Sequence, residues 1–197
     1  MEVDEQQPNS KHIAKRRKPT IISPHVAAAF RLLIFTGCRL REILRLRWDH
    51  VDFERGMLFL PDSKTGRKAV VLNAIAIQVL GDLERIGNYV IAGDNAGTEQ
   101  EKPRADLKRP WRGITRRARL DGLRIHDLRH SFASVGAGGG MGLPIVGKLL
   151  GHADQATTAR YAHLDNDPLR QASNAIGKAI AHAMDGNVAA DRSVDSG

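Results

Sequence analysis

Residues 50–53 alternate polar and apolar side chains, the period of a β-strand, and two short apolar runs follow, each after turn residues. Strands are predicted at His50–Phe53, Met57–Leu60 and Ala69–Leu72, with turns at 54–56 and 62–66. Because turns this short join antiparallel neighbours, the three strands form one small antiparallel sheet. Most of the remaining chain has helical spacing. The predicted fold class is therefore α+β, predominantly helical with a small three-stranded antiparallel sheet.

Helix boundary signals flank this sheet on both sides. Ser23 and Pro24 suit the N-cap and first position of a helix, and Gly37 ends the apolar segment VAAAFRLLIFT. A second helix is expected at about 39–46. Asn73 can cap a third, whose apolar face would carry Ile77, Leu80, Leu83 and Ile86.

The second half of the chain is expected to be a loop followed by helices. Residues 88–105 have no period, and from Leu107 onward the spacing is helical except for a glycine-rich break at 136–142. Leu169–Met184 forms an amphipathic helix that either packs on its own domain or docks onto a neighbouring protomer. The predicted organisation is a flexible basic arm at 1–22, one folded domain at 23–185 and a disordered tail at 186–197.

Composition narrows the class of protein. The formal net charge of +8 indicates an anionic partner, nucleic acid before an acidic membrane surface. Cys38 is the only cysteine, which excludes an intrachain disulfide and a cysteine metal cluster and suits a reducing compartment. The N-terminus lacks the apolar core of a signal peptide, and no apolar run approaches the roughly 18 residues of a membrane span. A soluble, cytoplasmic protein is expected.

Basic residues are concentrated between Arg104 and Arg129. This stretch holds nine Lys or Arg residues against three Asp, which gives +6 and most of the excess charge of the chain. One interpretation is a helix face that follows DNA phosphates and releases their counterions on binding. The other is an ordinary solvated face.

His126 and Arg129 lie at i and i+3 of a predicted helix and could hold one phosphate together, although a surface pair is the simpler interpretation. His130 adds an i, i+4 histidine pair that could suggest zinc. With no third ligand in view, no metal site is predicted.

Other polar residues also have plain structural interpretations when each is taken alone. Arg39 could pair locally with Glu42, and Lys64 could be a turn lysine in solvent. His152 could end a helix, and Tyr161 could be a half-buried aromatic residue.

Taken in chain order, five short motifs resemble the tyrosine recombinase (phage integrase) family. They are TGCRLREIL, SKTG at a hairpin tip, HDLRH, LLGH and TTARYAH, and the likeness covers roughly residues 24–185. The resemblance implies the family's DNA breaking and rejoining catalytic domain at 23–185. It also implies site-specific recombination through a 3′-phosphotyrosyl intermediate.

The resemblance assigns a role to each motif position. Tyr161 would be the nucleophile, and Arg39 and Arg129 would bind the non-bridging phosphate oxygens. Lys64 would protonate the 5′-oxygen leaving group, and His126 would move the tyrosine proton or bind the phosphate.

Two further positions match the family pattern. His152 would hydrogen-bond the phosphate or support the site, and Glu42 would be a structural acid. Contacts to DNA are expected from Lys108, Arg109, Arg112, Arg116, Arg117 and Arg119. Because these side chains supply the charge, neither a metal nor an organic cofactor is implied. The implied partner is double-stranded DNA, bound by a homotetramer, with no membrane.

One departure from the family leaves two alternatives open. Tyrosine recombinases usually carry an N-terminal core-binding domain, whereas about twenty polar residues precede the first predicted helix. One alternative is therefore a truncated, non-catalytic DNA-binding remnant. The other is a type IB topoisomerase-like relaxing activity, which uses similar chemistry without a partner site.

Overall fold

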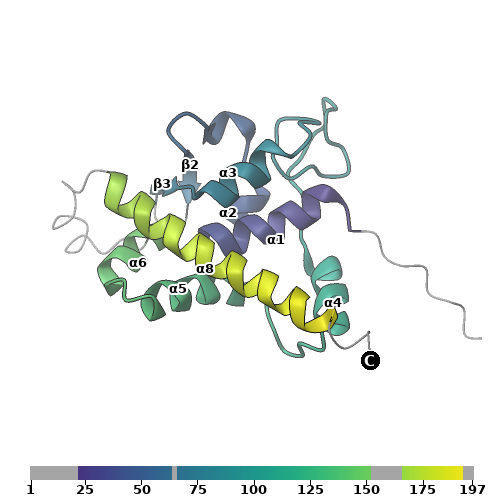
Figure 1. Ribbon diagram of the computed structural model, residues 1–197. Helices are drawn as coiled ribbons and strands as arrows, with labels where there is room; N and C mark the ends of the chain where they lie inside the picture. The colour runs from purple at the N-terminus through teal and green to yellow at the C-terminus, as the bar shows by residue number, and fades with distance from the viewer. Residues whose placement is uncertain (1–21, 64–65, 152–165, 193–197) are drawn as a thin grey trace, which may run out of the picture.

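The computed structural model describes residues 22–63, 66–151 and 166–192. This part of the chain is mostly helical, as the sequence predicts, and a small sheet lies at one side of the helices (Figure 1). The helices and the 3-10 turn are α1 (Pro24–Thr36), α2 (Leu40–Leu44), η1 (Trp48–His50), α3 (Ala74–Gly81), α4 (Lys108–Arg117), α5 (Asp127–Gly138), α6 (Leu143–Leu150) and α8 (Asn166–Arg192). The strands are β1 (Val51–Asp52), β2 (Met57–Ser63) and β3 (Gly66–Val71).

The sheet is an antiparallel meander in the order β1-β2-β3. All three predicted strands are present, although β1 is shorter than expected and β3 begins earlier, at Gly66. The register between β2 and β3 shifts between Leu60 and Ser63. Pro61 lies within this shift, and since proline has no N–H for a strand ladder, the irregularity falls where pairing is weakest. Ser63 pairs with Gly66 and closes the hairpin.

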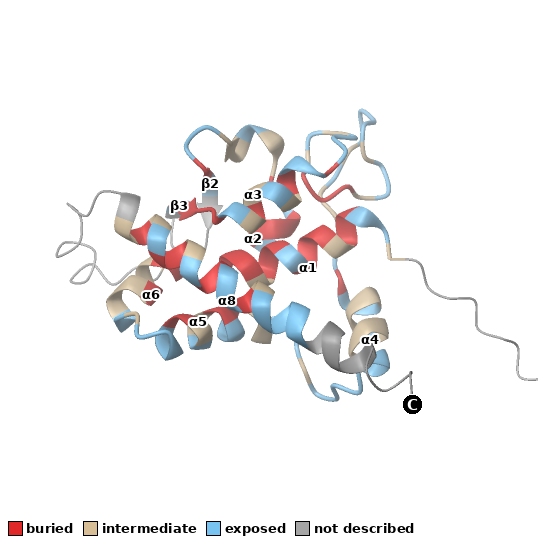
Figure 2. Ribbon diagram, in the orientation of Figure 1, coloured by how far each residue is buried: buried red, intermediate tan, exposed pale blue. Residues whose placement is uncertain are grey.

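Helix α1 runs through the centre of the domain. Ser23 Oγ accepts a hydrogen bond from the Val26 amide at its start, and Gly37 ends it with a left-handed φ of 64°. Nine of its thirteen residues are buried because α2, α3, α5 and α8 all pack against it (Figure 2). Both predicted boundaries of this helix are confirmed.

Three helical predictions were too long. Helix α2 covers only Leu40–Leu44, and α3 ends at Gly81, so Leu83 is buried beyond the helix while Ile86 is exposed. The stretch after Leu107 is not continuously helical, because residues 118–126 form an additional break. Arg119 has a left-handed φ of 54° there, which no helix accommodates.

The long helix α8 packs on its own domain. Leu169, Ala172, Ile176 and Ile180 are buried against α1, α3, α5 and α6, whereas Ala179 and Ala183 are exposed. The helix continues to Arg192, so residues 186–192 are helical rather than a disordered tail. No helix in the described ranges combines the length and the apolar character needed to cross a membrane.

Candidate functional site

The turn after α1 places Arg39 and Glu42 together. Gly37 reverses the chain, and Arg39 becomes the N-cap residue of α2. Glu42 reaches back from the first turn: its Oε2 accepts the Arg39 backbone N–H at 2.8 Å and its Oε1 accepts Arg39 Nη1 at 3.0 Å. This is one half of a capping box. The backbone and side chain of Arg39 are therefore both held by one carboxylate.

Lys68 completes the surroundings of this carboxylate. Its Nζ donates to Glu42 Oε2 at 3.1 Å, and both side chains are buried. Burial of Glu42 raises its pKa. The hydrogen bond from the Arg39 backbone and the charge of Lys68 outweigh that effect, so the pKa lies below its usual value and the carboxylate stays charged.

Arg129 on α5 is buried and bonded to the main chain. Its Nη1 donates to the Gly37 carbonyl and its Nη2 to the Leu150 carbonyl at 3.0 Å. These carbonyls lie at the C-terminal ends of α1 and α6, where helix dipoles favour a cation. Burial lowers the pKa of Arg129, and repulsion from the Arg39 guanidinium is the second cause. The fold thus brings the two predicted phosphate-binding arginines near each other.

Close packing at two glycines fixes the C-terminal ends of α1 and α6. A Cβ at Gly37 would lie 2.7 Å from Leu150 Cδ2 and 2.8 Å from Phe132 Cδ1. Gly151 has a φ of 69°, and a Cβ there would collide with the Lys68 side chain. A substitution at either position would displace the residues around Arg129.

His126 is exposed at the N-cap of α5. Partial burial lowers its pKa below the usual value, and the nearby charges of His130 and Arg129 add to this effect. Its ring contacts the His130 ring edge to face, with centroids 4.9 Å apart. Within the described ranges, no group of three His, Cys, Asp or Glu side chains has a metal-binding arrangement.

Three of the predicted catalytic residues, Lys64, His152 and Tyr161, lie outside the described residues. For Lys64 and His152, but not for Tyr161, the residue directly before is described. Lys64 falls between the paired residues Ser63 and Gly66, and His152 directly follows Gly151. Arg39, His126 and Arg129 are the predicted catalytic residues within the described ranges.

The candidate DNA-contacting residues are all exposed on α4 and just beyond it. Trp111 attaches the helix to the domain: its ring packs on Phe30 with centroids 5.1 Å apart, and its Nε1 donates to the Leu123 carbonyl at 2.8 Å. The exposed side carries no acidic residue within α4. Lys108, Arg109, Arg112, Arg116, Arg117 and Arg119 form what we call the basic face.

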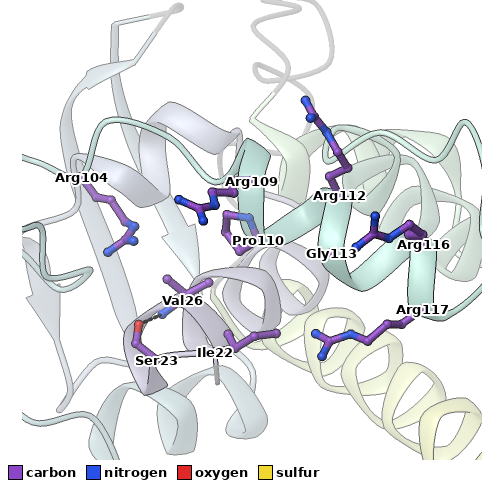
Figure 3. Close-up of a pocket in the computed structure, with 10 residues that line it drawn as sticks. All are labelled: Ile22, Ser23, Val26, Arg104, Arg109, Pro110, Arg112, Gly113, Arg116 and Arg117. Carbon is purple, nitrogen blue, oxygen red and sulfur yellow. Dashed lines mark hydrogen bonds between the residues drawn. The ribbon is translucent and has the colours of Figure 1, made fainter. Parts of the chain in front are cut away.

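A cavity of about 480 Å³ lies between the basic face and the start of α1. Ile22, Ser23 and Val26 form its α1 side (Figure 3). The arginines that line it are Arg104, Arg109, Arg112, Arg116 and Arg117. In Figure 3, Arg117 points toward Ile22 while Arg112 extends away from α1. Guanidinium groups around an open space suit a polyanion.

The basic stretch is not the single stripe that the sequence suggested. Arg129 is buried, and Arg124 pairs with Asp127 at 2.9 Å. Arg104 is half-buried and donates to the Ala92 carbonyl at 3.1 Å. Arg104 and Arg129 belong to the packing of the domain, whereas Arg124 is exposed in its ion pair with Asp127.

Lys68 is the residue that sequence reasoning missed. A signal was present, because the alternation of β3 places Lys68 on the same face as the buried Val70. An inward-facing lysine requires an acidic partner. The sequence alone does not indicate that this partner is Glu42, 26 residues away.

Comparisons with known proteins agree with this architecture. The profile of the Phage integrase family matches residues 9–167. A shufflon-specific DNA recombinase from Escherichia coli is 31% identical over 148 residues, covering 68% of this chain and 34% of the relative. Tyrosine recombinase XerA from Saccharolobus solfataricus is 32% identical over 145 residues, covering 71% and 46%. The chain spans less than half the length of these two relatives.

Solved structures share the fold at low sequence identity. The integrase from mycobacterium phage Brujita gives a TM-score of 0.60 at 16% identity, covering 80% of this chain and 53% of that one. The XerH site-specific recombinase gives 0.52 at 24% identity, covering 78% and 47%. The matched family profile, the two relatives and the shared fold together assign this chain to the phage integrase family of tyrosine recombinases, whose catalytic domain it carries.

Proposed function

We propose that this chain cleaves and rejoins double-stranded DNA in site-specific recombination, with Tyr161 as the nucleophile. The observation that supports this most is a pair of arginines near each other. Glu42 holds Arg39, and the ends of two helices hold Arg129. The two guanidinium groups are close enough to repel each other. Two cations kept close at the cost of repulsion suit one anion between them. A phosphodiester with two non-bridging oxygens fits that requirement.

Cleavage proceeds by exchange of one ester bond for another. The Tyr161 oxygen attacks the phosphorus, the P–O5′ bond breaks, and a 3′-phosphotyrosyl ester forms. Lys64 gives its proton to the departing 5′-oxygen, and His126 takes the proton of the phenol, whose ordinary pKa is about 10. Arg39 and Arg129 bind the phosphorus oxygens as negative charge increases on them.

Rejoining is the same step in reverse. A 5′-hydroxyl attacks the phosphotyrosyl ester and releases Tyr161, so the bond energy is conserved and no nucleotide cofactor is required. His152 donates a hydrogen bond to the phosphate in both directions.

The basic face would hold the DNA duplex beside this site. Its six exposed cations support a phosphate-binding role. The XerH recombinase, which shares the fold, was solved as a post-cleavage complex bound to a palindromic substrate. We propose the same class of partner for this chain, with four copies assembled on DNA.

Covalent trapping tests the proposal. The substrate is a pool of DNA duplexes with randomised arms, each nicked beside a candidate cleavage position. Cleavage releases a short fragment that carries the 5′-hydroxyl. Rejoining is then impossible, so the protein remains attached. We expect a DNA adduct that survives denaturation, with the attachment mapped to Tyr161 by peptide sequencing. Tyr161→Phe removes the nucleophile and should abolish the adduct.

The chain offers a matched control, because its other tyrosine is Tyr89. Tyr89 is half-buried beside Arg47, outside the proposed site, so Tyr89→Phe should leave the adduct unchanged. DNA binding without an adduct on any substrate would contradict the proposal and indicate a binding remnant. Sequence-independent relaxation of supercoiled plasmid would indicate the topoisomerase-like alternative.

A further inference from the structure

Lys68 occupies an unusual position for a lysine. It is buried in β3, and its contact with Glu42 joins two segments 26 residues apart in the chain. A buried ion pair loses the hydration of both charges, and it is retained only where further hydrogen bonds satisfy the partners. Glu42 has those bonds, since both of its oxygens accept from Arg39.

The Glu42 carboxylate links Lys68 to Arg39. Its Oε2 is shared between the Arg39 amide at 2.8 Å and Lys68 Nζ at 3.1 Å, while its Oε1 accepts the Arg39 guanidinium at 3.0 Å. Arg39 and Glu42 belong to the same helical turn, so their contacts are local. Lys68 is the contact that fixes this turn against the sheet.

The same end of the Lys68 side chain also lies against Gly151. The side chain fills the space that a Cβ at Gly151 would need, and the preceding residue, Leu150, gives its carbonyl to Arg129. Lys68 therefore contacts Glu42, which holds Arg39, and also Gly151, which follows the residue whose carbonyl binds Arg129. Its Nζ donates to Glu42, so its charge is already paired within the domain.

We propose that Lys68 is a positioning residue: through Glu42 it holds the Arg39 guanidinium beside Arg129, so that both reach one phosphate. This inference rests on the proposed function for its catalytic consequence. Its structural part, the dependence of Arg39 on Lys68, stands independently of that function.

The first test measures adduct formation at saturating DNA, using a suicide duplex isolated from the randomised pool. Lys68→Met retains length and removes the charge. We expect its cleavage rate to fall on the order of 10²-fold, the usual loss for one displaced transition-state donor. The DNA dissociation constant should be unchanged. Lys68→Arg should recover most of the rate, and Lys178→Met, at an exposed position on α8, should match the wild type.

A second substrate distinguishes Arg39 from Lys64 as the residue affected. A 5′-bridging phosphorothiolate replaces the leaving oxygen by sulfur, which departs as a thiolate and needs no proton donor. Lys64→Met should be rescued by this substrate, and Lys68→Met should not. Rescue of Lys68→Met would overturn the inference, because Lys68 would then act through the hairpin tip.

A third measurement needs no catalysis and covers the case in which the wild type forms no adduct. In Lys68→Met, NMR titration should show the Glu42 carboxyl with a higher pKa, and the Arg39 amide should exchange faster with solvent. Lys68→Arg should restore both. Unchanged Arg39 exchange would overturn the inference whatever the enzyme does, whereas a missing wild-type adduct alone would overturn only the proposed function.

A double variant covers the case in which Lys68→Met folds poorly. Lys68→Met combined with Glu42→Gln leaves no unpaired buried charge. If Lys68 acts through Glu42, the double variant should cleave no more slowly than Glu42→Gln alone. An additive loss would contradict the inference.

Discussion

A guanidinium can be buried only where its N–H groups find acceptors and its charge is compensated. Arg129 meets both conditions with the Gly37 and Leu150 carbonyls, the dipoles of the two helices they end, and the nearby Glu42 carboxylate. These two bonds use two of the five donors of a guanidinium. The residue that we propose to bind the scissile phosphate therefore also joins α1 to α6.

The pH dependence of cleavage is a prediction at the residue scale. Partial burial lowers the pKa of His126, so its imidazole is neutral at pH 7 and can accept the Tyr161 proton. The cleavage rate should fall as the pH drops through a value below about 6.5, the ordinary pKa of histidine. His126→Gln should slow cleavage and remove this acidic limb, measured as adduct formation against pH.

His182→Gln is the matched control, since His182 is exposed on α8, and it should keep the limb. An acidic limb that persists in His126→Gln would contradict the assignment.

The lowered pKa of His126 also affects stability, because the unfolded chain binds the proton at a higher pH than the folded chain does. His126 therefore makes its full contribution to the free energy of unfolding above about pH 6.5, and this contribution declines as the pH falls through the folded-state pKa.

Helix α4 is an element with separate structural and DNA-binding sides. Trp111 attaches it to α1, and its exposed side carries only cations among its charged residues. We predict that Arg112→Gln with Arg116→Gln weakens DNA binding and flattens its salt dependence. Every phosphate that the protein no longer neutralises should reduce the slope of log K against log salt by about 0.9. Fluorescence anisotropy across a salt series measures both quantities.

Arg31→Gln controls for total charge, because Arg31 is exposed beside Phe35 and Ile75, away from α4. It should leave the slope unchanged. An equal reduction from Arg31→Gln would show that α4 has no special role.

Element boundaries were predictable where local chemistry sets them. Ser23, Gly37 and Asn73 act on neighbouring backbone groups. The helix starts predicted at Ser23 and Asn73 and the helix end predicted at Gly37 therefore agree with the structure. The break at 118–126 was missed although Asp121-Gly122 is a turn signal within it, and its start depends on Arg119 adopting a left-handed conformation that glycine usually supplies.

At the scale of the whole molecule, α8 closes the core. It packs against α1, α3, α5 and α6, and Ile176 is 1% exposed beside Gly136. We predict that Ile176→Ala lowers the free energy of unfolding of the monomer by about 2–5 kcal/mol, because it leaves a cavity among these helices. Urea unfolding at a concentration where the chain is monomeric measures this.

Met184→Ala is the control, since Met184 is 46% exposed near the end of the described side chains. Its effect should stay within about 0.5 kcal/mol. If Ile176→Ala left the monomer unaffected and altered the mass of the DNA complex, the helix would dock on a neighbouring copy instead.

The candidate site was suggested by the family resemblance and not by single residues. Taken alone, Arg129 suggested an exposed pair with His126, yet its partners lie 92 and 21 residues away in the chain. Burial of Arg129 and Lys68 depends on contacts that exist only after folding. The alternation of β3 indicates that Lys68 faces inward, but no local pattern identifies the partner of either residue.

The attachment of Arg129 to two helix ends has a consequence for how such genes decay. A copy that had lost its activity would still need an arginine at this position to keep α1 and α6 together. Retention of Arg129 is therefore poor evidence that a related copy is functional. The proposed nucleophile, Tyr161, is the more informative position for sorting working genes from inactive ones, because the proposed chemistry depends on its hydroxyl.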